Sequence, residues 1–318
     1  MATVGMVGLG LLGSAVAGRL RAAGHDVVGH DVVAEKVRAL VARGGKAAPS
    51  VEAVARAADA VCVVLPSLAA VEDVVVGPRG LAASGRAGQT VIQMSTISPA
   101  LTERLARGVG AKGLAFLDCP ISGTSGMVAR GDGIIFVGGE RGVFDRWRPV
   151  LEAVLPHAVF IGRPGQAMAL KLVANLLVGL HSAAAAEALL LAKKAGLDLG
   201  LALEVLTKSA ATSRMLEVRG PLIVKREFPP QMKLDLFMKD LHLIQEAAGN
   251  VGAPLPLTDV AERLYAAAMD AGHAGEDLAV VVEALEGAQR TGPARRGRTS
   301  GSSGKRISGG RPRKRATR

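Results

Sequence analysis

The chain of 318 residues contains only two cysteines, Cys62 and Cys119, and each lies in an apolar run with the composition of a strand. We therefore expect two buried thiols in a reducing compartment, and no disulfide. No spacing of potential ligands resembles a metal site, so the sequence predicts no bound metal. The N-terminus lacks a basic leader before its apolar run, which argues against a signal peptide.

Acidic residues are absent from residues 291–318, which hold ten of the 39 Lys and Arg residues. The preceding residues carry 29 basic and 28 acidic side chains and are nearly neutral. The basic segment also lacks an aromatic residue that could stack on bases, and its one large apolar side chain is Ile307. We predict a disordered basic tail, and any binding of nucleic acid would depend on it.

Long uninterrupted apolar runs are also absent. The longest apolar stretch is predicted to be one helix, 166–195, and polar or charged residues interrupt it at Lys171, Asn175, His181 and Glu187. The sequence therefore predicts no membrane-spanning segment and a soluble, cytoplasmic protein.

Strand and helix signals alternate over residues 1–162, whereas only helical signals follow over residues 163–290. The 49% of hydrophobic residues is enough for two domains with separate cores. The predicted fold class is therefore α/β: a Rossmann-type doubly wound parallel sheet, followed by an all-helical second domain and the basic tail at 291–318.

The first predicted strand, 3–7, runs directly into Gly8, Gly10 and Gly13, which open a helix, and Asp31 follows at the end of the next strand. Glycines at this spacing make a tight turn and let the backbone approach a pyrophosphate at the helix N-terminus. Asp31 would accept hydrogen bonds from ribose hydroxyls and repel a 2′-phosphate, which favours NAD over NADP. Its alternative role is to cap the helix that begins near Ala34.

Three later loops carry polar or turn-forming residues. Leu65-Pro66-Ser67 and residues 95–99 follow predicted strands, at the sheet edge where ligands bind in such folds. Ser122-Gly123-Thr124 offers consecutive N–H groups and two hydroxyls, which suit a carboxylate. Each loop also has an ordinary explanation, because Ser, Thr, Pro and Gly are typical of turns and hairpin-like connections.

Lys171 and Asn175 are the strongly polar side chains between residues 167 and 180, and they lie four residues apart on one face of the predicted helix. Burial would lower the pKa of the lysine toward the range that is useful in proton transfer. The alternative is a lysine that reaches solvent beside an asparagine. A second pair, Lys239 and Asp240, lies on an apolar helix and is typical of a solvated face.

Five segments in this order resemble the β-hydroxyacid dehydrogenase family, which includes 3-hydroxyisobutyrate dehydrogenase and tartronate semialdehyde reductase and is similar to 6-phosphogluconate dehydrogenase. They are GLGLLG (8–13), MSTISP (94–99), DCPISGTSGMVARG (118–131), GRPGQAMALKLVAN (162–175) and FMKDL (237–241). The resemblance covers residues 1 to about 290 and implies an NAD(P)-dependent dehydrogenase that acts on a CH–OH group.

The resemblance also implies roles for individual residues. Lys171 would be the catalytic acid/base, and Asn175 would hold the substrate beside it. The substrate carboxylate would bind to Ser122, Gly123 and Thr124, and Asp240 would orient neighbouring groups. Residues that would bind the dinucleotide are Gly8, Gly10, Leu11, Leu12, Gly13, Asp31, Leu65, Pro66, Thr96 and Lys239.

Three positions differ from the family pattern. Ala174 precedes Asn175 where paired asparagines are common, Ala167 stands where a glycine is usual, and Thr124 replaces the second glycine of a Ser-Gly-Gly loop. None of them removes a group that transfers a proton. They reshape the pocket, so the resemblance does not define the substrate.

The predicted reaction is NAD-dependent oxidation of a short 3-hydroxy acid, similar to 3-hydroxyisobutyrate, to its semialdehyde, or the reverse reduction. The alternatives are a tartronate or succinic semialdehyde reductase, a threonate-type sugar-acid dehydrogenase, an imine reductase of related fold, and a non-catalytic nucleic-acid binder that uses the basic tail. The run Ala183–Ala186 in the long helix indicates close helix packing and predicts a homodimer or homotetramer.

Overall fold

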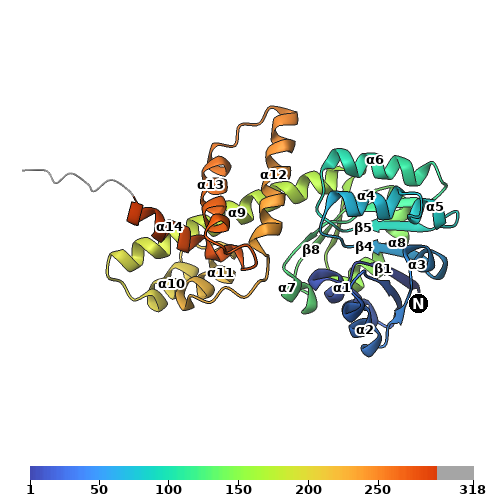
Figure 1. Ribbon diagram of the computed structural model, residues 1–318, viewed down its shortest axis with the longest axis horizontal. Helices are drawn as coiled ribbons and strands as arrows, with labels where there is room; N and C mark the ends of the chain where they lie inside the picture. Colours follow the sequence, from blue (N-terminus) through green and yellow to red (C-terminus); the bar gives the residue numbers. More distant parts are fainter. Residues whose placement is uncertain (292–318) are drawn as a thin grey trace, which may run out of the picture.

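The computed structural model describes residues 1–291, so the predicted disordered tail beyond Thr291 lies outside the described residues. The N-terminal part is built on a β-sheet and the C-terminal part is helical, apart from one isolated bridge between Lys233 and Asp277. Helix α9 (Gln166–Lys194) belongs to both parts, because it starts beside the sheet and runs through the helical part (Figure 1).

The strands of the N-terminal part form one sheet in the order β3-β2-β1-β4-β5-β6-β8, and β7 and β9 both pair with β8. Their bounds are β1 (Thr3–Val7), β2 (Asp26–His30), β3 (Lys46–Ala47), β4 (Ala60–Val63), β5 (Thr90–Gln93), β6 (Ala115–Asp118), β7 (Ile121–Ser122), β8 (Ile134–Gly139) and β9 (Ala158–Gly162).

The predicted doubly wound parallel sheet is confirmed for β1 to β6, which pair in parallel. The sheet departs from this parallel pattern at β8, which runs antiparallel to both β6 and β7. The connection between β7 and β8 contains only the short helix α7 (Ser125–Ala129). A parallel crossover needs a dozen or more residues, so this connection returns the chain antiparallel.

Helices cover both faces of the sheet and bury it between two apolar clusters. One cluster includes residues of α1 (Leu11–Ala22), α2 (Ala34–Ala42) and α8 (Arg141–Val154). The other includes residues of α3 (Val51–Ala57), α4 (Leu68–Val76), α5 (Leu81–Ser84) and α6 (Pro99–Gly110). The central strands β4 and β5 are buried throughout, and Cys62 and Cys119 are buried free thiols, as predicted.

The helical part packs around α9, which contacts all of its neighbours. These are α10 (Leu199–Lys208), α11 (Arg214–Lys225), α12 (Leu234–Val251), α13 (Pro256–Asp270), the 3₁₀ helix η1 (Leu278–Val280) and α14 (Val281–Thr291). A Cβ at Gly179 of α9 would lie 2.9 Å from Cζ of Phe237, so the glycine lets α12 cross α9 closely.

By length and composition α9 could cross a membrane, since its most apolar window has a mean hydropathy of 1.5. The four polar residues that interrupt it therefore do not exclude a span by themselves, contrary to the expectation from sequence. Of that window, 44% is buried inside the protein, and the helix packs against α11, α12, α13 and α14. These contacts place α9 at the centre of the helical part.

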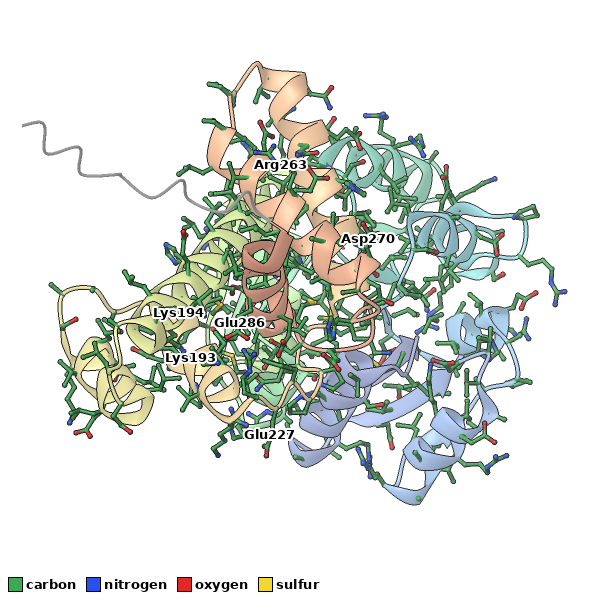
Figure 2. The ribbon with its side chains drawn as sticks, turned by 60° about the vertical axis from the view of Figure 1, so that its left-hand side comes forward. Lys193, Lys194, Glu227, Arg263, Asp270 and Glu286 are labelled. Carbon is green, nitrogen blue, oxygen red and sulfur yellow. The ribbon has the colours of Figure 1, made fainter. Side chains whose placement is uncertain are left out.

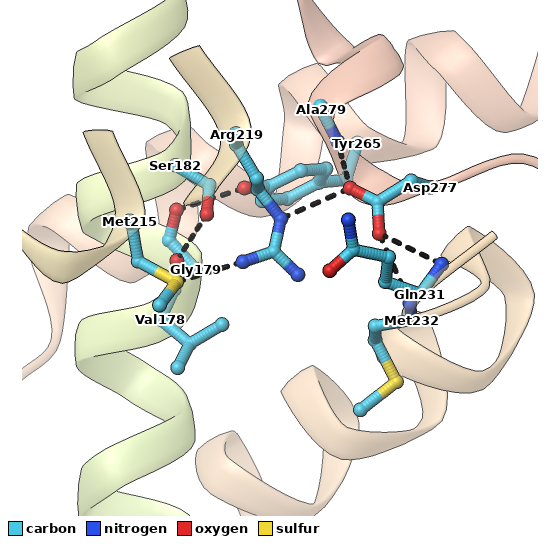
Figure 3. Close-up of polar contacts among 10 residues, drawn as sticks. All are labelled: Val178, Gly179, Ser182, Met215, Arg219, Gln231, Met232, Tyr265, Asp277 and Ala279. Atoms are coloured by element: carbon cyan, nitrogen blue, oxygen red, sulfur yellow. Dashed lines mark hydrogen bonds and ion pairs between the residues drawn. The ribbon is translucent and has the colours of Figure 1, made fainter. Parts of the chain in front are cut away.

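A buried polar network holds the helical part together (Figure 3). Nε of Arg219 on α11 lies 3.0 Å from Oδ1 of Asp277, and both side chains are at most 2% exposed. The Asp277 carboxylate also accepts the backbone N–H groups of Met232 and Ala279, each at 3.0 Å. The hydroxyl of Tyr265 on α13 donates to the carbonyl of Gly179 on α9 at 2.8 Å. Since a buried charge needs such partners, the network fixes the helices around α9.

The C-terminal end of α9 is joined to α14 by a surface ion pair (Figure 2). Nζ of Lys193 lies 3.0 Å from Oε1 of Glu286, while the adjacent Lys194 is exposed. An exposed pair of this kind contributes little to stability. The position of α9 therefore depends on its buried contacts and on its first turn.

Candidate active site

The turn between β1 and α1 contains glycines with different structural roles. Gly8 has a φ of +94°, and a Cβ there would lie 2.0 Å from the carbonyl oxygen of Val64. A Cβ at Gly13 would lie 2.1 Å from the carbonyl oxygen of Gly8. At Gly10 a Cβ would meet nothing within 4 Å, and no side chain caps the helix that begins after it. Gly8 and Gly13 thus shape the turn, whereas Gly10 and the first N–H groups of α1 face open space.

Asp31 fastens this turn to the end of β2. Its Oδ2 accepts the N–H of Leu9 at 2.7 Å, its Oδ1 accepts the N–H of Val33 at 2.9 Å, and Nζ of Lys36 lies 3.4 Å from each oxygen. Burial opposes ionisation, but these hydrogen bonds and Lys36 outweigh it and hold the pKa of Asp31 below its ordinary value. The alternative capping role is not observed, because α2 begins after Val33 without a side-chain cap.

A cavity of about 610 Å³ opens beside the glycine turn. Its lining includes Gly10, Leu11 and Lys36, together with Ser125 and Gly126 of α7. Since α7 follows directly on residues 122–124, the turn after β1 and the predicted carboxylate loop lie on neighbouring parts of the molecule.

The Ser122-Gly123-Thr124 loop takes part in local structure, as its alternative explanation requires. Ser122 belongs to β7 and pairs with Ile134 of β8, and Oγ1 of Thr124 accepts the N–H of Met127 at 3.3 Å. All three residues remain partly exposed. The Thr124 hydroxyl accepts in this contact, so its proton is still available to a ligand.

The loops after β4 and β5 are joined to each other. The N–H of Leu65 donates to Oγ of Ser95 at 2.9 Å, and Ser67 caps α4 by accepting the N–H of Ala70 at 3.2 Å. Leu65 and Thr96 are partly exposed and Pro66 is exposed, all just beyond the carboxyl ends of their strands. This is the sheet edge at which such folds bind ligands.

A second cluster lies where α9, α12 and the loop after β5 meet. Nδ2 of Asn175 donates to Oδ2 of Asp240 at 2.7 Å, and Nζ of Lys239 donates to Oδ1 of Asp240 at 2.7 Å. The same ammonium donates to the carbonyl of Thr96 at 2.7 Å. The fold therefore brings Thr96, Asn175, Lys239 and Asp240 into one network, although they are far apart in sequence.

The solvated face that the sequence pattern favours for Lys239 and Asp240 is wrong. Asp240 is 2% exposed and the side chain of Lys239 is 27% exposed, because α12 packs these residues against α9 and the loop after β5. A lysine at position 171 that reaches solvent is also wrong, since Lys171 is 6% exposed and Asn175 is 2% exposed.

Lys171 lies at the border of the two cores. Met168, one turn before it, belongs to a cluster on the sheet, and Leu172 belongs to the cluster of the helical part. Burial lowers the pKa of Lys171 to about 8, while Asp240 opposes this shift and the charge of Lys239 adds to it. An amine with this pKa can accept and donate a proton near neutral pH.

Sequence reasoning missed Asp118, which ends β6. Its Oδ2 accepts the N–H groups of Gly165 and Met168 at the start of α9, at 3.1 and 3.0 Å. The available signal was an acidic residue at the end of an apolar strand, the same signal that identified Asp31. Within residues 1–291 no group of three or more His, Cys, Asp or Glu residues could hold a metal.

Comparison with known proteins places this arrangement in a family. Residues 3–162 match the NAD-binding domain of 6-phosphogluconate dehydrogenase, and residues 165–285 match the NAD-binding domain of NADP-dependent 3-hydroxyisobutyrate dehydrogenase. The chain is 34% identical to 2-hydroxy-3-oxopropionate reductase of Escherichia coli K12, over 78% of this chain and 85% of the relative. The chain belongs to the β-hydroxyacid dehydrogenase family. It is therefore an NAD(P)-dependent dehydrogenase that acts on CH–OH groups.

Two further members show the range of the β-hydroxyacid dehydrogenase family. The chain is 35% identical to L-threonate dehydrogenase of Escherichia coli K12, over 72% of this chain and 76% of the relative. Its structure is similar to the crystal structure of 3-hydroxyisobutyrate dehydrogenase from Salmonella typhimurium, with a TM-score of 0.82 over 89% of this chain and 99% of that one. The sequences of the two proteins are 34% identical. Members this similar differ in substrate, so family membership leaves the substrate open.

The residues around the glycine turn fit the NAD(P) dinucleotide that the family binds. The position that a Cβ of Gly10 would occupy is open, and the uncapped N-terminus of α1 offers N–H groups to a pyrophosphate.

We predict that Gly10→Ala weakens NADH binding about tenfold or more, because its methyl group would occupy the space of the pyrophosphate. The fold should be unaffected, since the new Cβ meets no protein atom. Gly249→Ala is the matched control, because Gly249 on α12 does not line the cavity beside the glycine turn and also has no atom within 4 Å of a new Cβ. Fluorescence titration with NADH and thermal denaturation measure both effects, and equal affinity of the two variants would contradict the prediction.

Proposed function

We propose that this protein oxidises a short 3-hydroxy acid, similar to 3-hydroxyisobutyrate, to its semialdehyde with NAD, or catalyses the reverse reduction, with Lys171 as general acid/base. The observation that carries the proposal is the buried Lys171 amine, whose pKa is lowered to about 8, on the same helical face as Asn175. A charged group in this position is unfavourable for packing, so a role in proton transfer explains its presence.

When bound, NAD supplies the acceptor for the hydride that leaves the substrate carbon. Neutral Lys171 accepts the proton of the substrate hydroxyl at Nζ, and in the reverse direction the ammonium returns it to the carbonyl oxygen. Asp240 accepts one N–H of Asn175, which holds the amide in place and leaves its other polar groups for the substrate. Partly exposed Ser122, Gly123 and Thr124 would bind the carboxylate through hydroxyl and backbone N–H groups.

The dinucleotide in this proposal is NAD, held by Gly8, Gly10, Gly13 and the first N–H groups of α1 at Leu11 and Leu12. Asp31 supports this choice, because its lowered pKa keeps a negative charge where a 2′-phosphate would lie. The loop at Leu65 and Pro66, with Thr96 and Lys239, would line the remainder of the dinucleotide.

The alternative function is reduction of tartronate semialdehyde, the compound named 2-hydroxy-3-oxopropionate in a relative of similar identity. A threonate-type dehydrogenase is a further alternative for the same reason. All of these substrates carry a carboxylate and a carbonyl or hydroxyl group, so the same lysine and loop serve each of them. A non-catalytic nucleic-acid binder would depend on residues 291–318, and it leaves the buried Lys171 unexplained.

A homodimer or homotetramer is also part of the proposal. The residues that support it are not the alanines on which the sequence prediction was based. Ala183, Ala185 and Ala186 are buried within the chain, so this alanine run packs the helical part itself. Apolar side chains that stay exposed include Leu170, Val173, Leu177 and Leu191 of α9, with Leu201 and Val205 of α10. Exposed apolar groups of this size are typical of subunit contacts.

We predict that Lys171→Ala lowers kcat about 10²- to 10⁴-fold, the usual contribution of a general acid/base, while the affinity for NADH stays within about twofold. NADH absorbance, followed with 3-hydroxyisobutyrate, glycerate and threonate, measures turnover and ranks the substrates. Lys194→Ala is the control, because this exposed lysine lies at the other end of α9 (Figure 2). Turnover near the wild-type rate in Lys171→Ala would refute the proposal.

The pH dependence should have opposite signs in the two directions. Oxidation needs neutral Lys171, so kcat/KM for the hydroxy acid should rise with pH and level off above about 8. Reduction needs the ammonium, so kcat/KM for the semialdehyde should fall as pH rises through about 8. Initial rates over a pH series measure both profiles, and an oxidation rate that falls over this range contradicts the assigned role.

For cofactor choice, we predict that Asp31→Asn lowers the preference for NAD over NADP at least about tenfold, because the repulsion of a 2′-phosphate is removed. The amide oxygen can still accept an N–H from the turn, so the fold should persist. The ratio of kcat/KM for the two cofactors is the measurement. An unchanged ratio would show that Asp31 does not determine cofactor choice.

A further inference from the structure

The first turn of α9 lacks a cap from its own sequence. Gly165 occupies the N-cap position with a φ of +91°, and it has no side chain to accept the N–H groups that a helix start leaves unpaired. Asp118 of β6 caps the helix instead, since its Oδ2 accepts the N–H groups of Gly165 and Met168. The cap of the helix that carries Lys171 therefore comes from the sheet.

The same region of the sheet is shaped to receive this helix. Asp118 pairs with Gly138 in the β6–β8 ladder, and a Cβ at Gly138 would lie 2.8 Å from the carbonyl oxygen of Arg163 and 3.4 Å from Cβ of Ala167. Any larger residue at Gly138 would push the start of α9 away from the sheet. The carboxylate and the glycine thus both act on the start of α9.

That turn lies between the two groups on which the proposed reaction depends. Lys171 is three residues beyond Met168 on the same helix, and Ser122 is four residues beyond Asp118 in sequence. The first turn of α9 is itself part of the sheet core, because Met168 is fully buried there. A shift of this turn would move Lys171 relative to the loop at residues 122–124.

We propose that Asp118 is a positioning residue that holds the start of α9 against β6 and so fixes Lys171 relative to the substrate loop and the dinucleotide. This role rests on the proposed function of Lys171. It requires an acceptor oxygen at the position of Oδ2, and it does not require a negative charge.

Two observations on the carboxyl group agree with a role that needs the oxygen and not the charge. Oδ1 of Asp118 is buried and has no hydrogen-bond partner among the described residues. Burial raises the pKa of Asp118 to about 7, which the two hydrogen bonds only partly offset. The carboxyl group is therefore neutral in a large share of molecules near neutral pH, and both forms can accept the two N–H groups.

The test compares Asp118→Asn with Asp118→Ala in the full-length protein. The Asn side chain keeps an oxygen for both N–H groups, so kcat should stay within about threefold of wild type. The Ala side chain removes the acceptor, and kcat should fall about tenfold or more, since misplacement of a reacting group by about 1 Å can lower rates about 10²-fold. The affinity for NADH should change less than about twofold in both variants, because the glycine turn lies on other strands.

Gln89→Ala is the matched structural control. Gln89 is buried in the same sheet and donates to two backbone carbonyls, of Ala55 and Ala58, each at 2.7 Å, but it lies at the amino end of β5, away from the ligand edge. It should lower the melting temperature as Asp118→Ala does and leave kcat within about twofold. If Asp118→Ala does not fold, Asp118→Val replaces it, because its side chain fills more of the space of the carboxyl group and also offers no acceptor.

Three results would overturn the positioning role: a kcat within twofold of wild type in the Ala or Val variant, an equal loss of kcat in Gln89→Ala, or a loss of more than tenfold in Asp118→Asn. The last result would mean that the charge and not the oxygen is required. Failure of the proposed function is distinguishable, because it appears as retained turnover in Lys171→Ala whatever the Asp118 variants do.

Discussion

The structure depends on one helix that belongs to two hydrophobic cores. Helix α9 buries Met168 in the core of the sheet and Leu172, only four residues later, in the core of the helical part. Lys171 lies between them in the sequence of the helix, and its side chain is buried. Its lowered pKa is therefore a consequence of how the two parts are joined, and it does not require a dedicated charged partner.

The charges near this lysine are arranged to neutralise one another. Asp240 is shared by Asn175 and Lys239, and Lys239 also bonds the carbonyl of Thr96 in the sheet part. Asp240 is thus occupied by other donors and does not form an ion pair with Lys171. A carboxylate that paired with Lys171 would stabilise the ammonium form and deplete the neutral amine that the proposed oxidation needs.

Much of the fold could be predicted from the sequence, because strong local signals coincide with the elements. The glycine turn, the acidic residue at the end of β2 and the long Ala- and Leu-rich stretch each identified an element within a residue or two. The short helices α3, α4 and α5 gave no clear pattern, since segments of four to nine residues show too few turns for a period. The strand β8 was expected, but its antiparallel direction was not part of the predicted parallel sheet, because local sequence does not record strand direction and a hairpin-like connection was only the alternative interpretation of the loop before it.

The candidate site divides in the same way. Residues such as Lys171 and Asn175 were found because they are polar in an apolar helix. The local sequence around Asp240 led to the wrong prediction of a solvated face. A Lys-Asp pair shows the same sequence pattern on a solvated face and in a buried network. Asp118 was overlooked as a functional candidate, since the N–H groups that it accepts are 47 and 50 residues away. Contacts at such separations follow only from the tertiary fold.

The short α7 and the loop before it have a wider consequence. Residues 122–129 form a small segment at the end of the sheet, whereas Lys171 is fixed by two cores. If residues 122–124 bind the substrate as proposed, substitutions in the segment would change the shape of the pocket without disturbing Lys171, the proposed general acid/base. Under the proposed function, such a separation would let a lineage acquire new substrates through a few mutations in one partly exposed segment while the reaction type is inherited unchanged.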